Sequence, residues 1–221
     1  MIYFDIITLF PEAFSYLDVS MLKKAKDRKI IKIRFINPRE FTKDKYRQVD
    51  DKPYGGGPGM VLKFEPIYKA LEFSKKKVKA SKRKIILTHP AGKIFSQKIA
   101  RELAQQNQII IICGHYEGVD SRIEKFVDLK ISIGKYILTG GELPAMVIID
   151  STVRQLPGVL NHPLSLEEKR FSSSSVFSYP VYTRPEKIKV NNKILRVPRV
   201  LLSGNHQLIK QWINKKLKKI L

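Results

Sequence analysis

Three stretches of this chain combine an apolar run with a glycine-bearing turn, an arrangement suited to binding a ligand. They are Ile85–Gly92, Ile109–Gly118 and Ile131–Pro144. Glycine lets backbone N–H and C=O groups approach a ligand where any Cβ would collide, and it readily adopts positive φ. Apolar runs bounded by Gly or Pro are typical of strands buried in a parallel sheet, which binds ligands at the carboxyl ends of its strands. The glycines alone leave two interpretations open: three loops converging on one ligand, or ordinary turns.

The elements that would position these turns alternate between strand and helix. Ile2–Leu9 is predicted to be a strand, and a helix is expected from Pro11 to about Arg28. After the third turn, Pro144–Leu156 has helical spacing and ends at Pro157-Gly158. This alternation predicts an α/β fold with a mostly parallel sheet.

The composition changes after residue 160. Residues 161–178 are rich in serine and charge, with little apolar periodicity, which predicts a flexible linker. Residues 179–221 contain a helical pattern around Trp212 whose other side is rich in lysine. A basic helical module this small is expected to dock on something.

The charge balance and the single cysteine indicate which partner and which compartment to expect. Forty-two Lys and Arg against 20 Asp and Glu give a formal net charge of +22, which favours a polyanionic partner, RNA or DNA ahead of a membrane. A basic proteome background is the alternative explanation. Cys113 alone permits no intrachain disulfide, so a cytoplasmic location is expected. No apolar run reaches the roughly 18 residues that span a bilayer, and Asp5 argues against a signal peptide.

Several motifs together carry a family resemblance. They are Asp50–Met60, Cys113–Gly118, Ser132–Pro144, Leu156–Leu160 and Tyr182–Pro185. In this order along the chain, they resemble the bacterial tRNA (guanine-N1)-methyltransferases of the SPOUT superfamily. The resemblance implies a mostly parallel α/β sheet with a deep C-terminal trefoil knot, plus a small helical C-terminal domain. It also implies a homodimer with active sites at the interface, without membrane association.

The resemblance also implies domain roles and ligands. Residues 1–160 would bind S-adenosyl-L-methionine, and residues 179–221 would bind tRNA. The substrate would be guanosine 37, just 3′ of the anticodon and preceded by another guanosine. The expected cofactor-binding residues lie in the three glycine-bearing stretches: Thr88, Pro90, Gly114, Tyr116, Ile133, Gly134, Lys135, Tyr136, Ile137, Leu138, Gly140, Gly141 and Pro144.

The resemblance also concerns the residues that contact the substrate and a metal ion. Asp50, Gly59 and Lys169 are the expected substrate-binding residues. The resemblance allows a Mg²⁺ ion, but no stretch has metal-ligand spacing, so no ligands are assigned.

Methyl transfer to N1 of guanine needs a base and a cation. N1 carries a proton that must be removed. As the proton leaves, negative charge shifts onto O6. Arg154 matches the family's essential arginine, and a guanidinium can pair with the O6 edge of guanine; a surface salt bridge is the alternative. Glu117 matches a family glutamate, which could act in the site or only order its own turn.

The base is where this chain departs from the family. Lys169 occupies the place of the family's aspartate, next to Glu168. A protonated lysine cannot accept a proton, so three alternatives stand: Glu168 is the base, Asp50 or Asp51 substitutes, or the enzyme is slow or inactive. Glu168 is the preferred candidate.

Two other functions stay open at the level of sequence. One is another SPOUT RNA methyltransferase that modifies a different base or a ribose. The other is a catalytically impaired RNA-binding homologue that lacks the usual aspartate base.

Overall fold

The computed structural model describes residues 1–160 and 177–219. The chain divides into two compact units, Met1–Leu160 and Asn161–Leu221. The predicted linker lies almost entirely outside the described residues, as do Glu168 and Lys169. No helix in the described part is long and apolar enough to cross a membrane.

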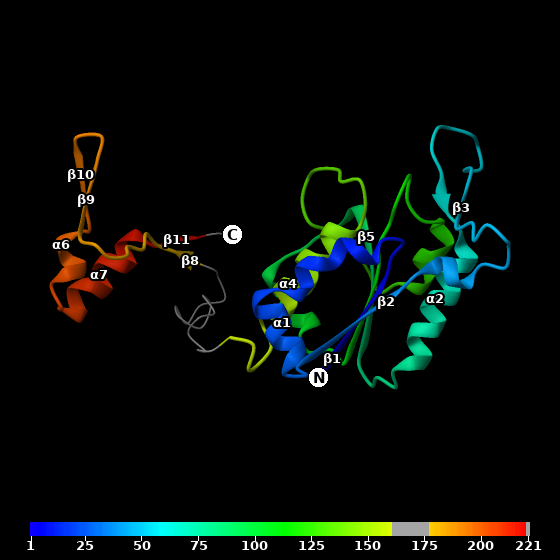
Figure 1. Cartoon of the computed structure of the whole chain (residues 1–221), viewed down its shortest axis with the longest axis horizontal. Coiled ribbons are helices and arrows are strands. Elements are labelled where there is room, and N and C mark those ends of the chain that lie inside the picture. Colours follow the sequence, from blue (N-terminus) through cyan, green and yellow to red (C-terminus); the bar gives the residue numbers. More distant parts are fainter. Residues whose placement is uncertain (161–176, 220–221) are drawn as a thin grey trace. The chain divides into compact units, whose positions relative to one another are not determined.

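A five-stranded parallel sheet forms the centre of the first unit (Figure 1). Its strand order is β2-β1-β6-β5-β7. The strands are β1 (Ile2–Ile7), β2 (Ile31–Ile36), β5 (Arg83–Ile94), β6 (Gln108–Ile112) and β7 (Leu129–Ser132). All five residues of β6 are buried, as expected for a strand covered on both faces. The predicted α/β class with a mostly parallel sheet is confirmed, whereas the trefoil knot stays a prediction.

Helices cover both faces of this sheet, and alternate strand residues contribute to two apolar cores. On one face, α1 (Ser20–Asp27), α3 (Gln97–Leu103) and α4 (Glu142–Val153) pack with the 3₁₀ helix η1 (Pro11–Asp18). On the other face lie α2 (Phe64–Lys77) and the 3₁₀ helices η2 (Pro38–Phe41) and η3 (Ser121–Phe126). In β6, Ile109 and Ile111 join the first core, and Ile110 and Ile112 join the second.

Two predicted elements differ from the structure. The single helix expected from Pro11 to Arg28 is instead η1 and α1, separated at extended Val19 and at Ser20, whose φ is 50°. The strand expected at Ile85–Thr88 is extended to Ile94. Thr88 and Lys93 both pair with Ile131, so the intervening residues 89–92 form an irregular excursion from the strand.

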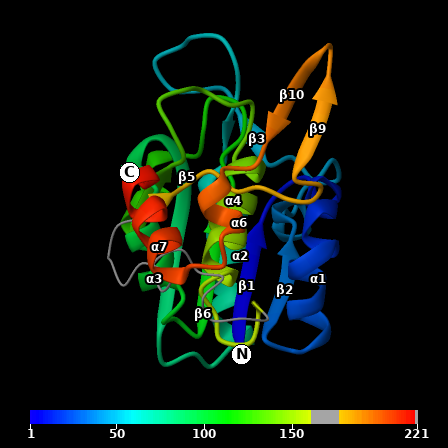
Figure 2. The same cartoon turned by 90° about the vertical axis from the view of Figure 1, so that its left-hand side faces the viewer.

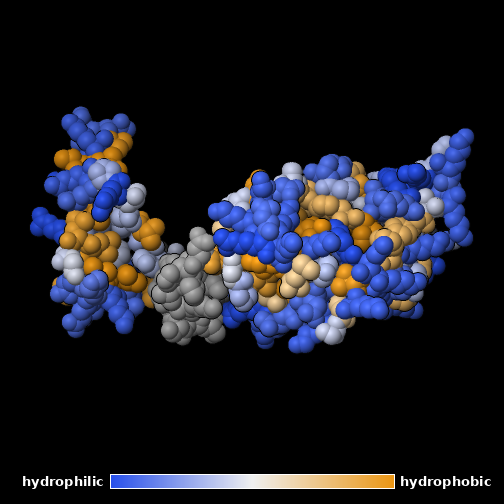
Figure 3. Space-filling view, turned by 60° about the horizontal axis from the view of Figure 1, so that its bottom comes forward, coloured by the Kyte–Doolittle hydropathy of each residue, from blue (hydrophilic) through white to orange (hydrophobic). Residues whose placement is uncertain are grey.

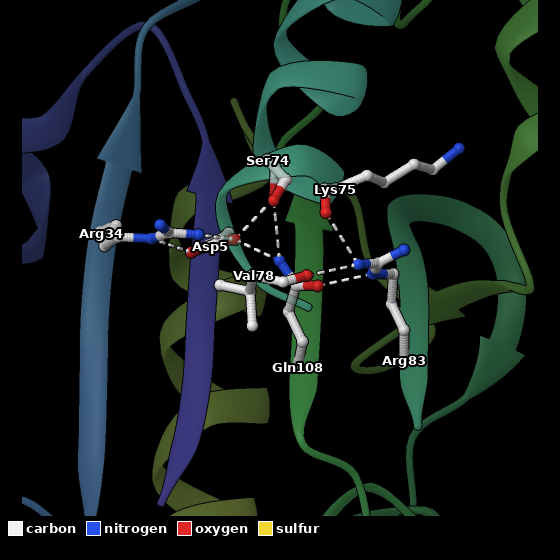
Figure 4. Close-up of polar contacts among 7 residues, drawn as sticks. All are labelled: Asp5, Arg34, Ser74, Lys75, Val78, Arg83 and Gln108. Atoms are coloured by element: carbon white, nitrogen blue, oxygen red, sulfur yellow. Dashed lines mark hydrogen bonds and ion pairs between the residues drawn. The ribbon is translucent and has the colours of Figure 1, made fainter. Parts of the chain in front are cut away.

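A buried polar network fastens α2 to the sheet (Figure 4). Asp5 is fully buried and accepts hydrogen bonds from Arg34 (2.6 Å from Nε), Ser74 Oγ (2.5 Å) and Gln108 Nε2 (2.6 Å). Arg83 belongs to a lysine-rich run, but its guanidinium donates to the backbone oxygens of Lys75 and Val78 at 2.9 and 2.8 Å. Arg83 therefore satisfies carbonyls at and beyond the carboxyl end of α2.

Residues 52–60 form a glycine-rich loop between two short strands, β3 (Asp50–Asp51) and β4 (Val61–Leu62). Four of its glycines have positive φ, between 81° and 113°. This backbone is strained for other residues, which explains the glycine density.

The described part of the second unit contains a β-hairpin that was not predicted. Strands β9 (Lys187–Val190) and β10 (Lys193–Arg196) precede helices α6 (Arg199–Leu202) and α7 (His206–Lys216). The alternation of Ile188 and Val190 and the turn at Asn191-Asn192, both with positive φ, are typical of a two-residue hairpin loop. The last two predicted linker residues form β8 (Phe177–Ser178), which pairs with β11 (Lys218–Lys219).

Candidate active site

The three glycine-bearing turns meet at the carboxyl ends of neighbouring strands β6, β5 and β7. Gly141 N donates to Gly114 O at 2.7 Å, and Gly114 N donates to Thr88 Oγ1 at 3.3 Å. His115 and Gly140 form an isolated antiparallel bridge. The turns therefore hold one another in place before any ligand binds.

Gly141 is the point of closest approach. A Cβ there would meet the Thr88 hydroxyl and lie within 2.7 Å of Gly114 N and 2.8 Å of Cys113 Cα. Its φ of −85° and ψ of −2° are open to any residue, so space and not conformation demands glycine.

The turns enclose a pocket of about 230 Å³. It gathers Glu117 and all of the predicted cofactor residues except Gly134 and Lys135: Thr88, Pro90, Gly114, Tyr116, Ile133, Tyr136, Ile137, Leu138, Gly140, Gly141 and Pro144. Seven lining residues were not predicted: His89, His115, Gly118, Val119, Ile131, Ser132 and Thr139. Most of these seven sit inside the same motifs, so taking whole turns as the site would have found them.

Gly134 and Lys135 lie in the third turn without lining the pocket. Ser132 Oγ donates to Gly134 O at 2.9 Å, and Tyr136 Oη donates to Ile133 O at 3.3 Å. The three atoms nearest to a Cβ on Gly134 would all belong to the Tyr136 ring. Gly134 thus shapes the turn, and the Lys135 side chain is exposed.

A buried carboxylate lies behind the pocket. Glu142, in the first turn of α4, is 8% exposed and accepts a hydrogen bond from Thr8 Oγ1 at 2.9 Å. The positive end of the helix dipole favours a carboxylate there. Burial raises the pKa of the Cys113 thiol, and the charge of Glu142 raises it further. The thiol therefore stays protonated and is a core group, not a nucleophile.

Glu117 lies between this pocket and a second one. Both pockets are lined by Glu117 and Val119. The second is also lined by Asp51, Lys52 and Tyr54 and by residues of α2 and η3. Glu117 N donates to Met60 O at 3.0 Å, and a Cβ at Gly59 would come within 2.6 Å of the Glu117 side chain. The structure thus brings Gly59 to Glu117, whereas Asp50 pairs with Leu62 and lines neither pocket.

Arg154 is at the opposite end of α4 from the cofactor pocket. Pro144 lines that pocket in the first turn of the helix, and Arg154 is the residue that follows its last turn. Ten residues of helix rise about 15 Å, more than an arginine side chain spans. Within one chain, the structure does not bring Arg154 into the pocket.

Replacing Gly141 by alanine tests the packing of the three turns. The added Cβ would collide with the Thr88 hydroxyl and with backbone atoms of Cys113 and Gly114, so we expect a loss of about 1–3 kcal/mol in the free energy of unfolding. Cofactor affinity should fall at least tenfold. Chemical denaturation and calorimetric titration measure the two effects.

The control for that experiment is Gly134→Ala. The three atoms nearest to its Cβ all belong to the exposed ring of Tyr136, which can turn aside, so stability should change little. If Gly141→Ala were as stable as the wild type, the close packing of these turns would not be needed for stability.

The described residues include no group of three or more His, Cys, Asp or Glu side chains that could hold a metal ion.

Comparison with known proteins identifies the family. The family profile described as tRNA (guanine-1)-methyltransferase TrmD matches residues 2–220. A tRNA (guanine-N(1)-)-methyltransferase of Dictyoglomus turgidum is 50% identical over 97% of this chain and 84% of its own length. One from Carboxydothermus hydrogenoformans is 53% identical over 96% of this chain and 81% of its own.

A solved structure agrees with these relatives. The crystal structure of tRNA (m1G37) methyltransferase from Aquifex aeolicus superposes with a TM-score of 0.79 at 40% identity. The match covers 97% of this chain and 90% of that one. This chain therefore belongs to the tRNA (guanine-1)-methyltransferase family of enzymes.

Proposed function

We propose that this protein transfers a methyl group from S-adenosyl-L-methionine to N1 of guanosine 37 in tRNA. The observation that carries the proposal is the meeting of three glycine turns around one pocket in a chain of this family. The turns expose backbone N–H and C=O groups beside apolar side chains, which suits an adenosine with a polar tail.

The residues of the pocket fit that cofactor. Leu138, Ile133 and Pro144 supply apolar walls, and Thr88, Ser132 and Glu117 supply polar groups. The Glu117 carboxylate would lie beside a cationic cofactor, where opposite charges attract. When bound, S-adenosyl-L-methionine supplies an electrophilic methyl group on its sulfonium.

The guanosine would approach from the side of the second pocket. Glu117 and Val119 line both spaces, so a base held there would be next to the methyl group. Gly59 allows the glycine-rich loop to pack closely on Glu117, and Asp50 and Lys169 are proposed to contact the substrate. Taking one base out of the anticodon loop is the usual way for a protein to reach its edge.

A homodimer is part of the proposal, with each active site at the interface. Helix α4 is apolar on several sides: Ala145, Ile148 and Ile149 are buried, but Leu143 and Val147 are 56% and 42% exposed. A helix that is apolar all round is normally covered.

The dimer also explains the position of Arg154. Because a chain's own Arg154 is at the far end of α4, we assign it to the pocket of the neighbouring subunit. There its guanidinium would stabilise the negative charge that develops on O6 of guanine.

The proton on N1 goes to the carboxylate of Glu168 in this scheme. As the N1–H bond breaks, a bond forms between N1 and the methyl carbon, and the bond between that carbon and sulfur breaks. Asp50 and Asp51 are the alternative acceptors. The Asp51 carboxylate already forms an ion pair, with its Oδ2 atom 3.6 Å from Lys63 Nζ.

Labelled-methyl transfer to defined transcripts tests this function. We expect label in a tRNA with guanosine at positions 36 and 37 and almost none when position 37 is adenosine. Mapping the modified nucleotide separates N1 methylation from modification of another base or a ribose. A folded, cofactor-binding protein that labels no tRNA would contradict the proposal.

Two further properties belong to the proposal. Mg²⁺ is proposed as an aid to the reaction, which transfer rates with added Mg²⁺ and with EDTA would check. A cytoplasmic location, where tRNA is found, completes it.

A further inference from the structure

The β9–β10 hairpin separates its charged and apolar side chains onto two faces. Residues directly opposite in an antiparallel pair share a face, and faces alternate along each strand. In this hairpin Lys187 pairs with Arg196, and Lys189 pairs with Ile194. We call the face with Lys187, Lys189 and Arg196 the basic face.

The other face is mainly apolar. It carries Ile188 paired with Leu195, and Val190 paired with Lys193. All residues of both strands are exposed. Figure 2 shows the hairpin extending away from α6 and α7, and Figure 3 shows hydrophilic and hydrophobic surface side by side on this unit.

The basic face places like charges together. Lys187 and Arg196 are directly opposite, a pairing that destabilises a hairpin. Glu186 lies 3.8 Å from Lys187, an exposed and weak ion pair. Residues 177–219 contain eleven Lys and Arg residues and a single acidic residue, Glu186. These like charges therefore do not stabilise the hairpin. A bound anion would reduce the repulsion between them.

We propose that the basic face of the β9–β10 hairpin binds RNA phosphates and strengthens the binding of tRNA without reading its sequence. A two-stranded ribbon cannot enter the deep, narrow major groove of A-form RNA, so base edges in helical RNA are out of its reach. Lys187 and Lys189 are about 7 Å apart along one strand, on one face, which lets them contact successive backbone positions. The proposal rests on the proposed function only for the identity of the RNA as tRNA.

Binding of tRNA to the full-length protein, followed by fluorescence anisotropy over a range of KCl concentrations without methyl donor, tests this. Lys189→Gln and Arg196→Gln should each weaken binding roughly fivefold and reduce the slope of log K against log[salt] by about 1. The loss should be the same for a transcript with adenosine at position 37, because phosphate contacts carry no sequence information.

Lys193→Gln is the matched control. It removes the same charge from the same hairpin, but on the opposite face, and should leave the slope unchanged. The proposal would be overturned if all three variants had the same salt slope as the wild type. It would also be overturned if Lys193→Gln lowered the slope as much as Lys189→Gln and Arg196→Gln do.

Thermal unfolding separates binding from folding. Arg196→Gln should unfold at the same temperature as the wild type or slightly higher, because a like-charge pair is removed; a lower temperature would indicate a structural role instead. Loss of binding to phosphatidylserine vesicles, with tRNA binding intact, would point to a lipid surface and contradict the proposal. Failure of methyl transfer with these slope changes intact would overturn the proposed function and still support the hairpin contact.

Discussion

Arg154→Ala should reduce the rate of methyl transfer by about 100- to 1,000-fold, the usual cost of removing one group that stabilises charge in a transition state. The guanidinium is proposed to pair with O6 of guanine as the N1 proton leaves. Cofactor affinity should change less than about twofold, because the guanidinium is proposed to contact O6 of guanine and not the cofactor. Single-turnover kinetics and calorimetric titration of the cofactor measure the two quantities.

Arg154→Lys is the control for charge alone. Lysine keeps the charge but lacks the planar fork that pairs with an oxygen edge, so an intermediate rate is expected. An Arg154→Ala enzyme with a rate within fivefold of the wild type would remove this residue from the mechanism.

Mixing subunits tests whether Arg154 acts across the interface. In a heterodimer of Arg154→Ala and Gly141→Ala, one site combines an intact pocket with the partner subunit's Arg154, so up to half of the activity should return. If each chain used its own arginine, both sites would be defective and none would return. Mixtures of each variant with itself give the baseline.

Glu168→Ala should slow methyl transfer by about 100- to 10,000-fold, the range typical of a lost general base. Without the proposed base to take the N1 proton, the nitrogen stays a poor nucleophile. Cofactor and tRNA affinities should survive, because the substitution leaves the three glycine turns intact. Rates at saturating cofactor and tRNA separate chemistry from binding.

Two controls sharpen this test. Glu168→Gln keeps the size of the side chain without its basicity and should be as slow as the alanine variant. Glu167→Ala removes the adjacent carboxylate and should be near normal. Near-normal turnover in Glu168→Ala, with a large loss in Asp50→Asn, would move the base to Asp50.

The sequence was sufficient for the class of fold and for the position of the ligand site along the chain. The isoleucine run 109–112 requires burial on both faces, which a parallel sheet covered by helices provides. Ser96 directly precedes α3, and its hydroxyl accepts a hydrogen bond from Ile99 N, as is typical of a serine at a helix N-cap. Local patterns of this kind are decided by neighbours in sequence.

The hairpin in the second unit has a signal in its local sequence. Apolar alternation on either side of Asn191-Asn192 is local information. The structure shows the pairing of the two strands directly.

Other features depended on residues distant in sequence. The order of strands β6, β5 and β7 determined that Gly141 packs against Gly114 and Thr88, and no local rule states which turns become neighbours. Arg83 looked like one more cation in a basic run until the fold brought it to the end of α2. By itself the sequence determined the parallel α/β class and the three glycine turns, since period and turn chemistry are local. Only the tertiary structure decided that these turns share one pocket, because strand order is set by long-range packing.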